Sequence, residues 1–267
     1  MSDILGYAGK RVVVTGAASG MGEATARIAN ELGAEVIGCD IRPVSGALKQ
    51  QIEVNLMDEA SIDDALLSIE GEIDVLLNCA GIPGPPFSNL ETMLVNFVGL
   101  RHFTEGLLPR IKNGGAIASI TSVAGMGFEK NLDKVREFLA TEGFAAGKAW
   151  CEANPDVANG YLFSKQAIIG YTKQQATKLC EREIRINCIS PAPTDTPMLP
   201  AFHDQISKEF MDEHFQAPVH RDATSEEMAE PLLFLGSDMA RFVSGQNLFV
   251  DYGYVGSVQI GDRQGLL

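Results

Sequence analysis

The feature that most constrains the fold is an alternation of short apolar runs with longer amphipathic segments. Apolar runs that are rich in β-branched residues and do not alternate with polar ones are typical of strands buried on both faces. Segments of helical pattern, such as residues 21–34 and 89–111, lie between these runs. Strand and helix in alternation favour right-handed crossovers and a parallel sheet covered on both faces. We therefore expect an α/β fold, a doubly wound, Rossmann-like parallel sheet with helices on both faces. The expected strands are residues 11–16, 34–40, 73–81, 115–122, 184–190 and 247–251.

Composition limits what such a chain does. The 267 residues are 45% hydrophobic and contain no repeat or long linker, so we expect a single domain over residues 1–267. A formal net charge of -14 argues against nucleic-acid binding, because such modules present basic surfaces. No stretch indicates a membrane span or a signal peptide, so a cytoplasmic location is expected. Five cysteines without a C-x-x-C pair, and four histidines without metal-ligand spacing, favour reduced thiols and no metal site.

A glycine turn follows the first expected strand. Gly16, Gly20 and Gly22 open the helical pattern, and Asp40 closes the second strand roughly 20 residues later. Missing side chains let backbone amides approach a pyrophosphate at the positive end of a helix. Strand, glycine turn, helix and distal acid together predict a dinucleotide site.

Asp40 also bears on which dinucleotide is used. A carboxylate at this strand end accepts hydrogen bonds from a ribose 2′-hydroxyl and repels a 2′-phosphate. The glycine turn contains no Lys or Arg to offset that repulsion. The sequence therefore predicts NAD(H), with Arg42 as the one nearby guanidinium that a phosphate could recruit.

Tyr161 and Lys165 stand four residues apart at the start of an expected helix, "YLFSKQAIIGYTKQQATKLC". Residues at this spacing lie one above the other on the same helix face. A fixed ammonium favours the ionised form of a neighbouring phenol and lowers a pKa that is ordinarily near 10. The pair predicts a phenol whose pKa is lowered enough for proton exchange. The alternative is that a Tyr and a Lys at this spacing are exposed residues on the surface of an amphipathic helix.

Several motifs together resemble the short-chain dehydrogenase/reductase family along nearly the whole chain. The glycine turn has the family's T-G-x-x-x-G-x-G spacing from Thr15 to Gly22, and "NCAG" at 78–81 matches its N-N-A-G except at Cys79. Asn96 lies in "LVNFVG" and Ser122 in "ITSVAG". The resemblance implies a catalytic tetrad of Asn96, Ser122, Tyr161 and Lys165.

The resemblance also implies a role for each residue. Tyr161 exchanges a proton with the substrate oxygen while hydride moves to or from a nicotinamide, and Lys165 lowers the phenol pKa and holds ribose hydroxyls. Ser122 orients the substrate oxygen, and the Asn96 side chain fixes a water that links Lys165 to solvent. Asn55 stands where the family often has an aspartate near the adenine. The cofactor-binding residues implied for NAD are Gly16, Ser19, Gly20, Met21, Gly22, Asp40, Asn55, Leu56, Asn78, Ala80, Gly81, Tyr161, Lys165, Pro191, Thr194 and Thr196.

Two segments bear on the substrate. Ser122 and Tyr161 are separated by far more residues than the family typically has there, which indicates an insertion at about 126–158 containing two amphipathic helices. The two helices could cap the substrate, form a contact between subunits, or project into solvent with a small core of their own. Residues of about 197–222 read as a substrate lid, or as ordinary helix core. The large apolar residues of this lid are Met198, Leu199, Phe202, Phe210, Met211 and Phe215.

The insertion and "PTDTP" are similar to the subgroup of 3α-hydroxysteroid dehydrogenase/carbonyl reductases. That resemblance implies a bulky hydrophobic alcohol or ketone as substrate, such as a 3α-hydroxysteroid or an aryl alcohol, and a homodimer or homotetramer. An alternative is a non-catalytic NAD(H)-binding sensor on the same fold, which would have no need of Tyr161 and Lys165. A sugar-nucleotide epimerase is disfavoured by the glycine spacing and the short C-terminal part.

Overall fold

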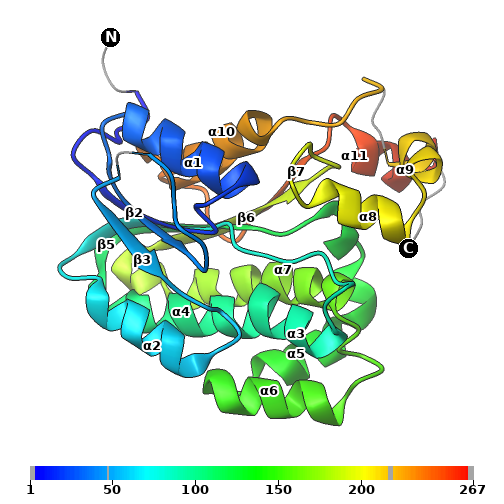
Figure 1. Cartoon of the computed structure of the whole chain (residues 1–267), viewed down its shortest axis with the longest axis horizontal. Helices are drawn as coiled ribbons and strands as arrows, with labels where there is room; N and C mark the ends of the chain where they lie inside the picture. Colours follow the sequence, from blue (N-terminus) through cyan, green and yellow to red (C-terminus); the bar gives the residue numbers. More distant parts are fainter. Residues whose placement is uncertain (1–3, 47, 216–218, 264–267) are drawn as a thin grey trace.

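The computed structural model describes residues 4–46, 48–215 and 219–263. Within them, seven parallel strands form one sheet in the order β3-β2-β1-β4-β5-β6-β7 (Figure 1). The strands are β1 (Arg11–Thr15), β2 (Glu35–Asp40), β3 (Gln50–Glu53), β4 (Ile73–Asn78), β5 (Ile111–Ile120), β6 (Arg185–Pro191) and β7 (Asn247–Val250). The strand order reverses between β1 and β4, which opens a crevice beyond the carboxyl ends of the strands.

Helices cover both faces of the sheet, as Figure 1 shows. On one face lie α1 (Gly20–Glu31) and α10 (Ser225–Gly236), which pack on each other. On the other lie α2 (Glu59–Ser68), α4 (Leu100–Leu107) and α7 (Tyr161–Lys178). This confirms the fold class predicted from the sequence. The remaining α-helices are α3 (Asn89–Met93), α5 (Leu132–Leu139), α6 (Gly143–Ala153), α8 (Leu199–Gln205), α9 (Lys208–His214) and α11 (Tyr254–Gln259).

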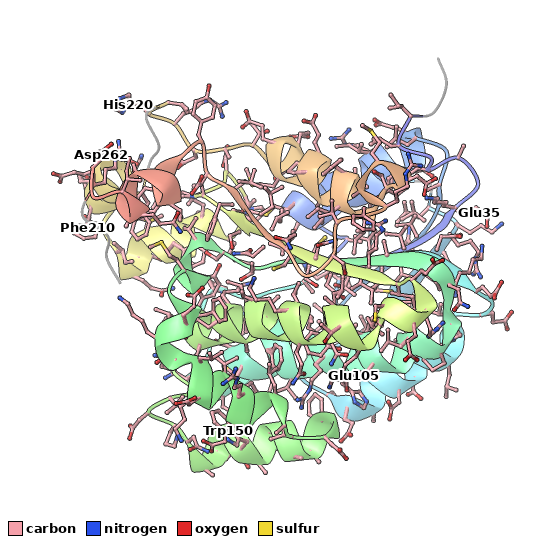
Figure 2. The ribbon with its side chains drawn as sticks, turned by 180° about the vertical axis from the view of Figure 1, so that it is seen from behind. Glu35, Glu105, Trp150, Phe210, His220 and Asp262 are labelled. Carbon is pink, nitrogen blue, oxygen red and sulfur yellow. The ribbon has the colours of Figure 1, made fainter. Side chains whose placement is uncertain are left out.

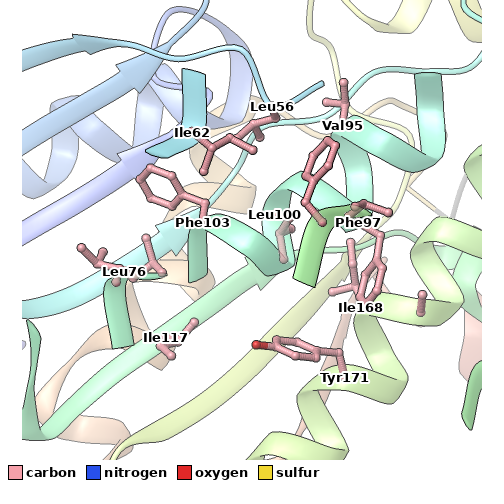
Figure 3. Packing of buried hydrophobic residues seen from close by; sticks show 14 of the residues in the cluster. Leu56, Ile62, Leu76, Val95, Phe97, Leu100, Phe103, Ile117, Ile168 and Tyr171 are labelled. Carbon is pink, nitrogen blue, oxygen red and sulfur yellow. The ribbon is translucent and has the colours of Figure 1, made fainter. Parts of the chain in front are cut away.

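The apolar strands bury residues on both sides of the sheet, which explains why their sequences do not alternate. In β1, Val13 joins the core beneath α2, α4 and α7, whereas Val12 and Val14 join the core beneath α1 and α10. Leu76 of β4 and Ile117 of β5 reach into the first of these cores (Figure 3). Both faces of the sheet are therefore dry, and the carboxyl ends of the strands are left as the place for a ligand.

The structure departs from the expected elements at three places. Strand β3 was not expected, because it is short, lies at the sheet edge and buries only Ile52. Strand β5 begins at Ile111 instead of residue 115, with a register shift against β4 near its start. The expected helix over 89–111 is interrupted, because its backbone is π-helical over η1 (Leu94–Gly99). Such π-bulges are frequent at functional sites.

The segment expected to be an insertion, residues 126–158, forms α5 and α6. These helices pack against α7 and η1 on the outer side of the molecule. Trp150 of α6 stacks on Phe138 of α5, with ring centroids 4.6 Å apart. Buried Arg101 of α4 donates to the carbonyl and hydroxyl oxygens of Thr141, in the turn between the two helices. The segment is thus attached to the domain by a shared core and a buried guanidinium.

Candidate active site

A cavity of about 1040 Å³ lies at the carboxyl ends of the strands. It is lined by the turn after β1, the end of β2, the loops after β4 and β5, the start of α7, the segment after β6, and α8 and α9. Sites for a single small ligand typically occupy about 300–1,000 Å³. The volume of this cavity therefore lies at the upper end of the usual range, as a large ligand such as a dinucleotide requires.

The glycine turn forms one wall of the cavity. Gly16 has φ 71°, and a Cβ there would lie 2.7 Å from the backbone nitrogen of Ala80. A Cβ at Gly22 would overlap the carbonyl oxygen of Gly16. The first N–H groups of α1 have no partner within the helix, and the helix dipole adds positive potential there. A close, amide-rich and side-chain-free wall of this kind fits a pyrophosphate.

Asp40 ends β2 at the same edge of the sheet. Its carboxylate is 8% exposed and accepts hydrogen bonds from the backbone N–H groups of Ala18 and Arg42, at 3.0 and 2.9 Å. The Arg42 guanidinium donates to the Ser19 hydroxyl at 2.6 Å, and its Nε lies 3.7 Å from the Asp40 carboxylate. The carboxylate is therefore held in a fixed orientation, and the nearby guanidinium already has protein partners.

Most of the other residues expected at the cofactor line the same cavity. Thr196 lies opposite the glycine turn, because its Cβ would be 3.3 Å from a Cβ placed at Gly20. Asn55 closes a local turn by accepting the N–H of Met57. Those that line the cavity are Gly16, Ser19, Gly20, Met21, Gly22, Asp40, Asn55, Leu56, Ala80, Gly81, Tyr161, Lys165, Pro191, Thr194 and Thr196.

Asn78 departs from that expectation, because it does not line the cavity. It is 1% exposed, and its side-chain nitrogen donates to the hydroxyls of Thr104 and Ser119 beneath the sheet. Its position in β4 turns the side chain toward α4, where Thr104 lies. We therefore assign Asn78 to the framework and not to the cofactor wall.

Tyr161, Lys165 and Ser122 meet at one point of the cavity. Tyr161 is the first residue of α7, and its phenol hydrogen-bonds the Ser122 hydroxyl at the end of β5. The Lys165 ammonium lies 5.2 Å from the centroid of the Tyr161 ring and donates to the Ile120 carbonyl at 3.3 Å. The i, i+4 spacing therefore places phenol and ammonium together inside the cavity, not on the surface.

The protonation of this group differs from the sequence expectation. Burial raises the pKa of Tyr161 to about 12, and the hydrogen bond to Ser122 offsets only part of that effect. Burial also lowers the pKa of Lys165 to about 8. Desolvation thus dominates the pKa of Tyr161 in the protein without a dinucleotide, and the expected lowering of that pKa by Lys165 together with a bound nicotinamide stays a prediction.

Asn96 acts through the loop after β4. It lies in the π-helical stretch η1 and is fully buried. Its side-chain oxygen accepts the N–H of Ile82 at 2.8 Å, and its nitrogen donates to the Ile82 carbonyl and to the Ser164 hydroxyl. The amide thus pairs with Ile82 as a neighbouring strand would. Both N–H donors of the amide are used within the protein, so its oxygen is the atom left to bind the expected water, and that role stays a prediction.

The rest of the cavity is apolar and faces Tyr161. Phe202 of α8 packs edge-on against the Tyr161 ring, with centroids 5.1 Å apart. All six large apolar residues of the expected lid line the cavity, although residues 216–218 of that segment lie outside the described residues. The loop over 82–87 also lines the cavity and adjoins α8, because the Gln205 side chain donates to its Pro83 carbonyl at 3.4 Å.

Sequence reasoning missed two parts of this wall. The run of Gly and Pro in residues 81–86, directly after a buried strand, was the available signal for the loop after β4. Tyr254 of α11 also lines the cavity, far along the chain from every expected site residue. No local pattern marks it.

Comparison with known proteins identifies the group to which this architecture belongs. The family described as "short chain dehydrogenase" matches residues 10–132, and "Enoyl-(Acyl carrier protein) reductase" matches residues 149–255. Coniferyl-alcohol dehydrogenase of Pseudomonas sp. (strain HR199 / DSM 7063) is 35% identical over 249 residues, which cover 91% of this chain and 96% of that protein. The chain belongs to the short-chain dehydrogenase/reductase family.

Two further members of the family are relevant to the expected subgroup. A 3-alpha-hydroxysteroid dehydrogenase/carbonyl reductase of Comamonas testosteroni is 28% identical over 253 residues, covering 91% of this chain and 95% of that protein. The crystal structure of the 3-alpha-hydroxysteroid dehydrogenase from Pseudomonas sp. B-0831 complexed with NADH is 25% identical. It has a TM-score of 0.78 and covers 96% of this chain and 100% of that one.

The segment 126–158 of this short-chain dehydrogenase does not cap the cavity. Of its residues, only Met126 lines the cavity, while α5 and α6 pack against α7 and η1. Trp150 of this segment and Phe210 of the expected lid lie in separate parts of the molecule (Figure 2). The possibility that the two helices cover the substrate is therefore not supported by their position.

Neither a metal cluster nor a membrane helix is found in the part of the chain that the structure describes. No three His, Cys, Asp or Glu side chains there are placed to hold a metal ion. No described helix has the length and hydropathy needed to cross a bilayer. Each of the five cysteines is a free thiol.

Proposed function

We propose that the protein is an NAD-dependent oxidoreductase that interconverts a hydroxyl and a carbonyl on a bulky hydrophobic substrate. The observation that carries this proposal is the position of the Tyr161 phenol. It is hydrogen-bonded to Ser122 and lies beside the Lys165 ammonium, in the same cavity as the glycine turn and Asp40. A proton-exchanging group and a wall suited to a dinucleotide thus share one cavity.

The residues divide the chemistry between them. A nicotinamide dinucleotide, when bound, supplies the hydride acceptor or donor. Tyr161 gives its proton to a carbonyl oxygen in reduction and takes one from an alcohol in oxidation. Ser122 donates to the substrate oxygen and stabilises charge that develops on it. The Lys165 ammonium stabilises the phenolate form of Tyr161, and Asn96 holds the adjoining loop in place through Ile82.

The preference for NAD rests on Asp40. Both oxygens of its carboxylate accept backbone N–H groups, which fixes a negative charge at the end of β2. This charge accepts bonds from a ribose 2′-hydroxyl and repels a 2′-phosphate. Arg42 is engaged with Ser19 and Asp40. Steady-state kinetics with both cofactors test the assignment, and equal or better kcat/KM with the phosphorylated cofactor would contradict it.

The substrate class rests on the apolar half of the cavity. Met198, Phe202, Met211 and Phe215 belong to the segment 197–222, which we propose acts as a substrate lid. Relatives named for coniferyl alcohol and 3-alpha-hydroxysteroids support aryl alcohols and 3α-hydroxysteroids as the classes to screen. A panel of such alcohols and the matching carbonyl compounds, followed by NADH absorbance, identifies the class.

The decisive variant is Tyr161→Phe, which removes one oxygen atom. We expect NADH affinity, measured by fluorescence titration, to change little and kcat to fall by about 10²–10⁴-fold, the usual contribution of a positioned acid or base. The matched control is Tyr252→Phe, because Tyr252 is 77% exposed and does not line the cavity. Retained turnover in Tyr161→Phe would refute the assignment. A wild type that binds NADH tightly but turns over no alcohol or ketone would favour the NAD(H) sensor.

Assembly and location complete the proposal. We propose a homodimer or homotetramer, supported by the exposed apolar side chains Phe242 and Leu248 beside and on the edge strand β7. Light scattering coupled to size-exclusion chromatography tests this, and a monomer at micromolar concentration would contradict it. The free thiols support a reducing, cytoplasmic location. Cell fractionation tests that location.

A further inference from the structure

Tyr254 is a buried polar side chain in the wall of the cavity. It begins α11, is 1% exposed, and packs in a small apolar cluster with Val123 and Val255. Its ring lies against that of Phe215, with centroids 5.8 Å apart. Its hydroxyl has no hydrogen-bond partner among the described residues. Buried polar groups in native proteins are nearly always paired, so an unpaired hydroxyl in a cavity wall requires an explanation.

The other polar side chains of the substrate half differ from Tyr254. Asn89, Asn159 and Gln205 line the cavity but are exposed to solvent. Two of them already hold the wall together, since Asn159 accepts the N–H of Phe163 and Gln205 donates to Pro83. Water satisfies what remains of their hydrogen-bonding capacity. The Tyr254 hydroxyl has no partner among the described residues, and its side chain is shielded from bulk solvent, so a ligand in the cavity is a source of one.

We propose that Tyr254 is a specificity-determining residue that hydrogen-bonds a second polar group of the substrate, separate from the reacting hydroxyl or carbonyl. The substrate class is then narrower than a bulky apolar alcohol or ketone, because it carries a further hydroxyl, ether or carbonyl oxygen. This inference rests on the proposed function, since the reacting end must lie at Tyr161 and Ser122. The neutral phenol both donates and accepts, so it pairs with any of these oxygens.

Phe215 links Tyr254 to the segment that we propose as the lid. It directly follows α9, and its ring lies against the Tyr254 ring with centroids 5.8 Å apart. A substrate oxygen paired with the hydroxyl would then be bound close to this ring. A ligand without the distal oxygen leaves the hydroxyl unpaired.

The test uses pairs of alcohols that differ by one oxygen far from the carbinol. One pair is cinnamyl alcohol and 4-hydroxycinnamyl alcohol, and the other is 5α-androstan-3α-ol and androsterone. We expect the wild type to prefer the oxygen-bearing member of at least one pair by about three- to tenfold in kcat/KM, the effect of one neutral hydrogen bond. In Tyr254→Phe the preference falls to about one while kcat/KM for the other member is kept. Tyr252→Phe keeps the wild-type preference.

Affinity measured by calorimetry on the NADH-saturated protein separates this inference from the proposed function. If the protein binds the oxygen-bearing member more tightly through Tyr254 but forms no NADH from any alcohol, the proposed function is overturned and the role of Tyr254 is kept. Three outcomes would overturn the role of Tyr254. The wild type and Tyr254→Phe could show the same preference, Tyr254→Phe could lose kcat/KM equally for both members of a pair, or the wild type could show no preference. Thermal unfolding gives a second readout. We expect Tyr254→Phe to be at least as stable as the wild type, and a Tm lower by several degrees would show that the hydroxyl has a partner within the free protein.

Discussion

Lys165→Met replaces a buried ammonium by an apolar side chain of similar length. Lys165 is 4% exposed, and its one polar contact among the described residues is the 3.3 Å bond to the Ile120 carbonyl. No described carboxylate forms a salt bridge with it. Burial without a counter-charge lowers its pKa from 10.5 to about 8. The folded protein thus contains a charge that opposes folding and that we propose is needed for the reaction.

The free-energy cost of burying the Lys165 charge, and the pH range over which it applies, follow from the pKa of Lys165. One pKa unit corresponds to about 1.4 kcal/mol, so the shift amounts to about 3 kcal/mol. Below pH 8 Lys165 is protonated in both states, and the folded state bears the full cost. Between pH 8 and 10.5 the folded state releases the proton while the unfolded state keeps it, so the cost fades as pH rises. The lost bond to Ile120 offsets about 1 kcal/mol. We expect Lys165→Met to be about 2 kcal/mol more stable than the wild type at pH 7 and no more stable above pH 10.

Urea unfolding of both proteins between pH 6 and pH 10, without added dinucleotide, measures the difference. The only tryptophan, Trp150, reports the transition because it stacks on Phe138 and Phe163 in the core. Lys178→Met is the matched control, because Lys178 lies on the same helix but is exposed, and we expect it to change stability by less than about 0.5 kcal/mol. A Lys165→Met protein no more stable than the wild type at pH 7, or a difference that does not vary between pH 7 and 10, would refute the reasoning. Turnover should be lost in Lys165→Met at every pH.

Three further substitutions test separate parts of the framework. Gly22→Ala places a methyl group on the carbonyl oxygen of Gly16, so we expect NADH binding to disappear from fluorescence titrations, and an unchanged Kd would contradict the close approach of the two segments. Arg101→Met removes the buried guanidinium that holds the turn between α5 and α6. We expect a loss of about 2–4 kcal/mol in urea unfolding and faster hydrogen exchange concentrated in those helices, whereas an evenly spread increase would show that it does not anchor them. Asn96→Ala leaves both backbone groups of Ile82 unpaired, so kcat should fall about tenfold or more with NADH affinity kept; an unchanged kcat would exclude this positioning role.

The parts of the fold that the sequence predicted are those determined by burial on both faces of an element. Each of the six apolar runs contains a strand, because a parallel sheet sealed by helices admits few polar residues. Strand β3 escaped prediction because an edge strand buries one residue in four, Ile52, and leaves no apolar run. The π-helical stretch at Asn96 escaped because its apolar sequence reads as an ordinary helix, and the pairing of the Asn96 side chain with Ile82, 14 positions away, leaves no local pattern.

The site shows a similar division. Spacing was sufficient to bring Tyr161 and Lys165 together, because a helix fixes the relation between i and i+4. Their pKa values were not predictable, because they depend on how much protein surrounds them, including Phe202 from the distant helix α8. Tyr254 was invisible for the same reason, since an unpaired hydroxyl is a property of its tertiary neighbours and not of any local motif.

The pairing of Asn96 with Ile82 divides the loop after β4 into two parts, the segment 78–81 beside Tyr161 and Lys165 and the cavity wall over residues 83–87. Because a buried amide holds the first residue beyond "NCAG", the chain is already fixed when it enters the wall over residues 83–87. We therefore expect that this wall can be exchanged for one of different length or shape while Tyr161 and Lys165, on the other side of the amide, keep their positions. Ile82 would then be the point at which a new loop is joined to change which substrates bind.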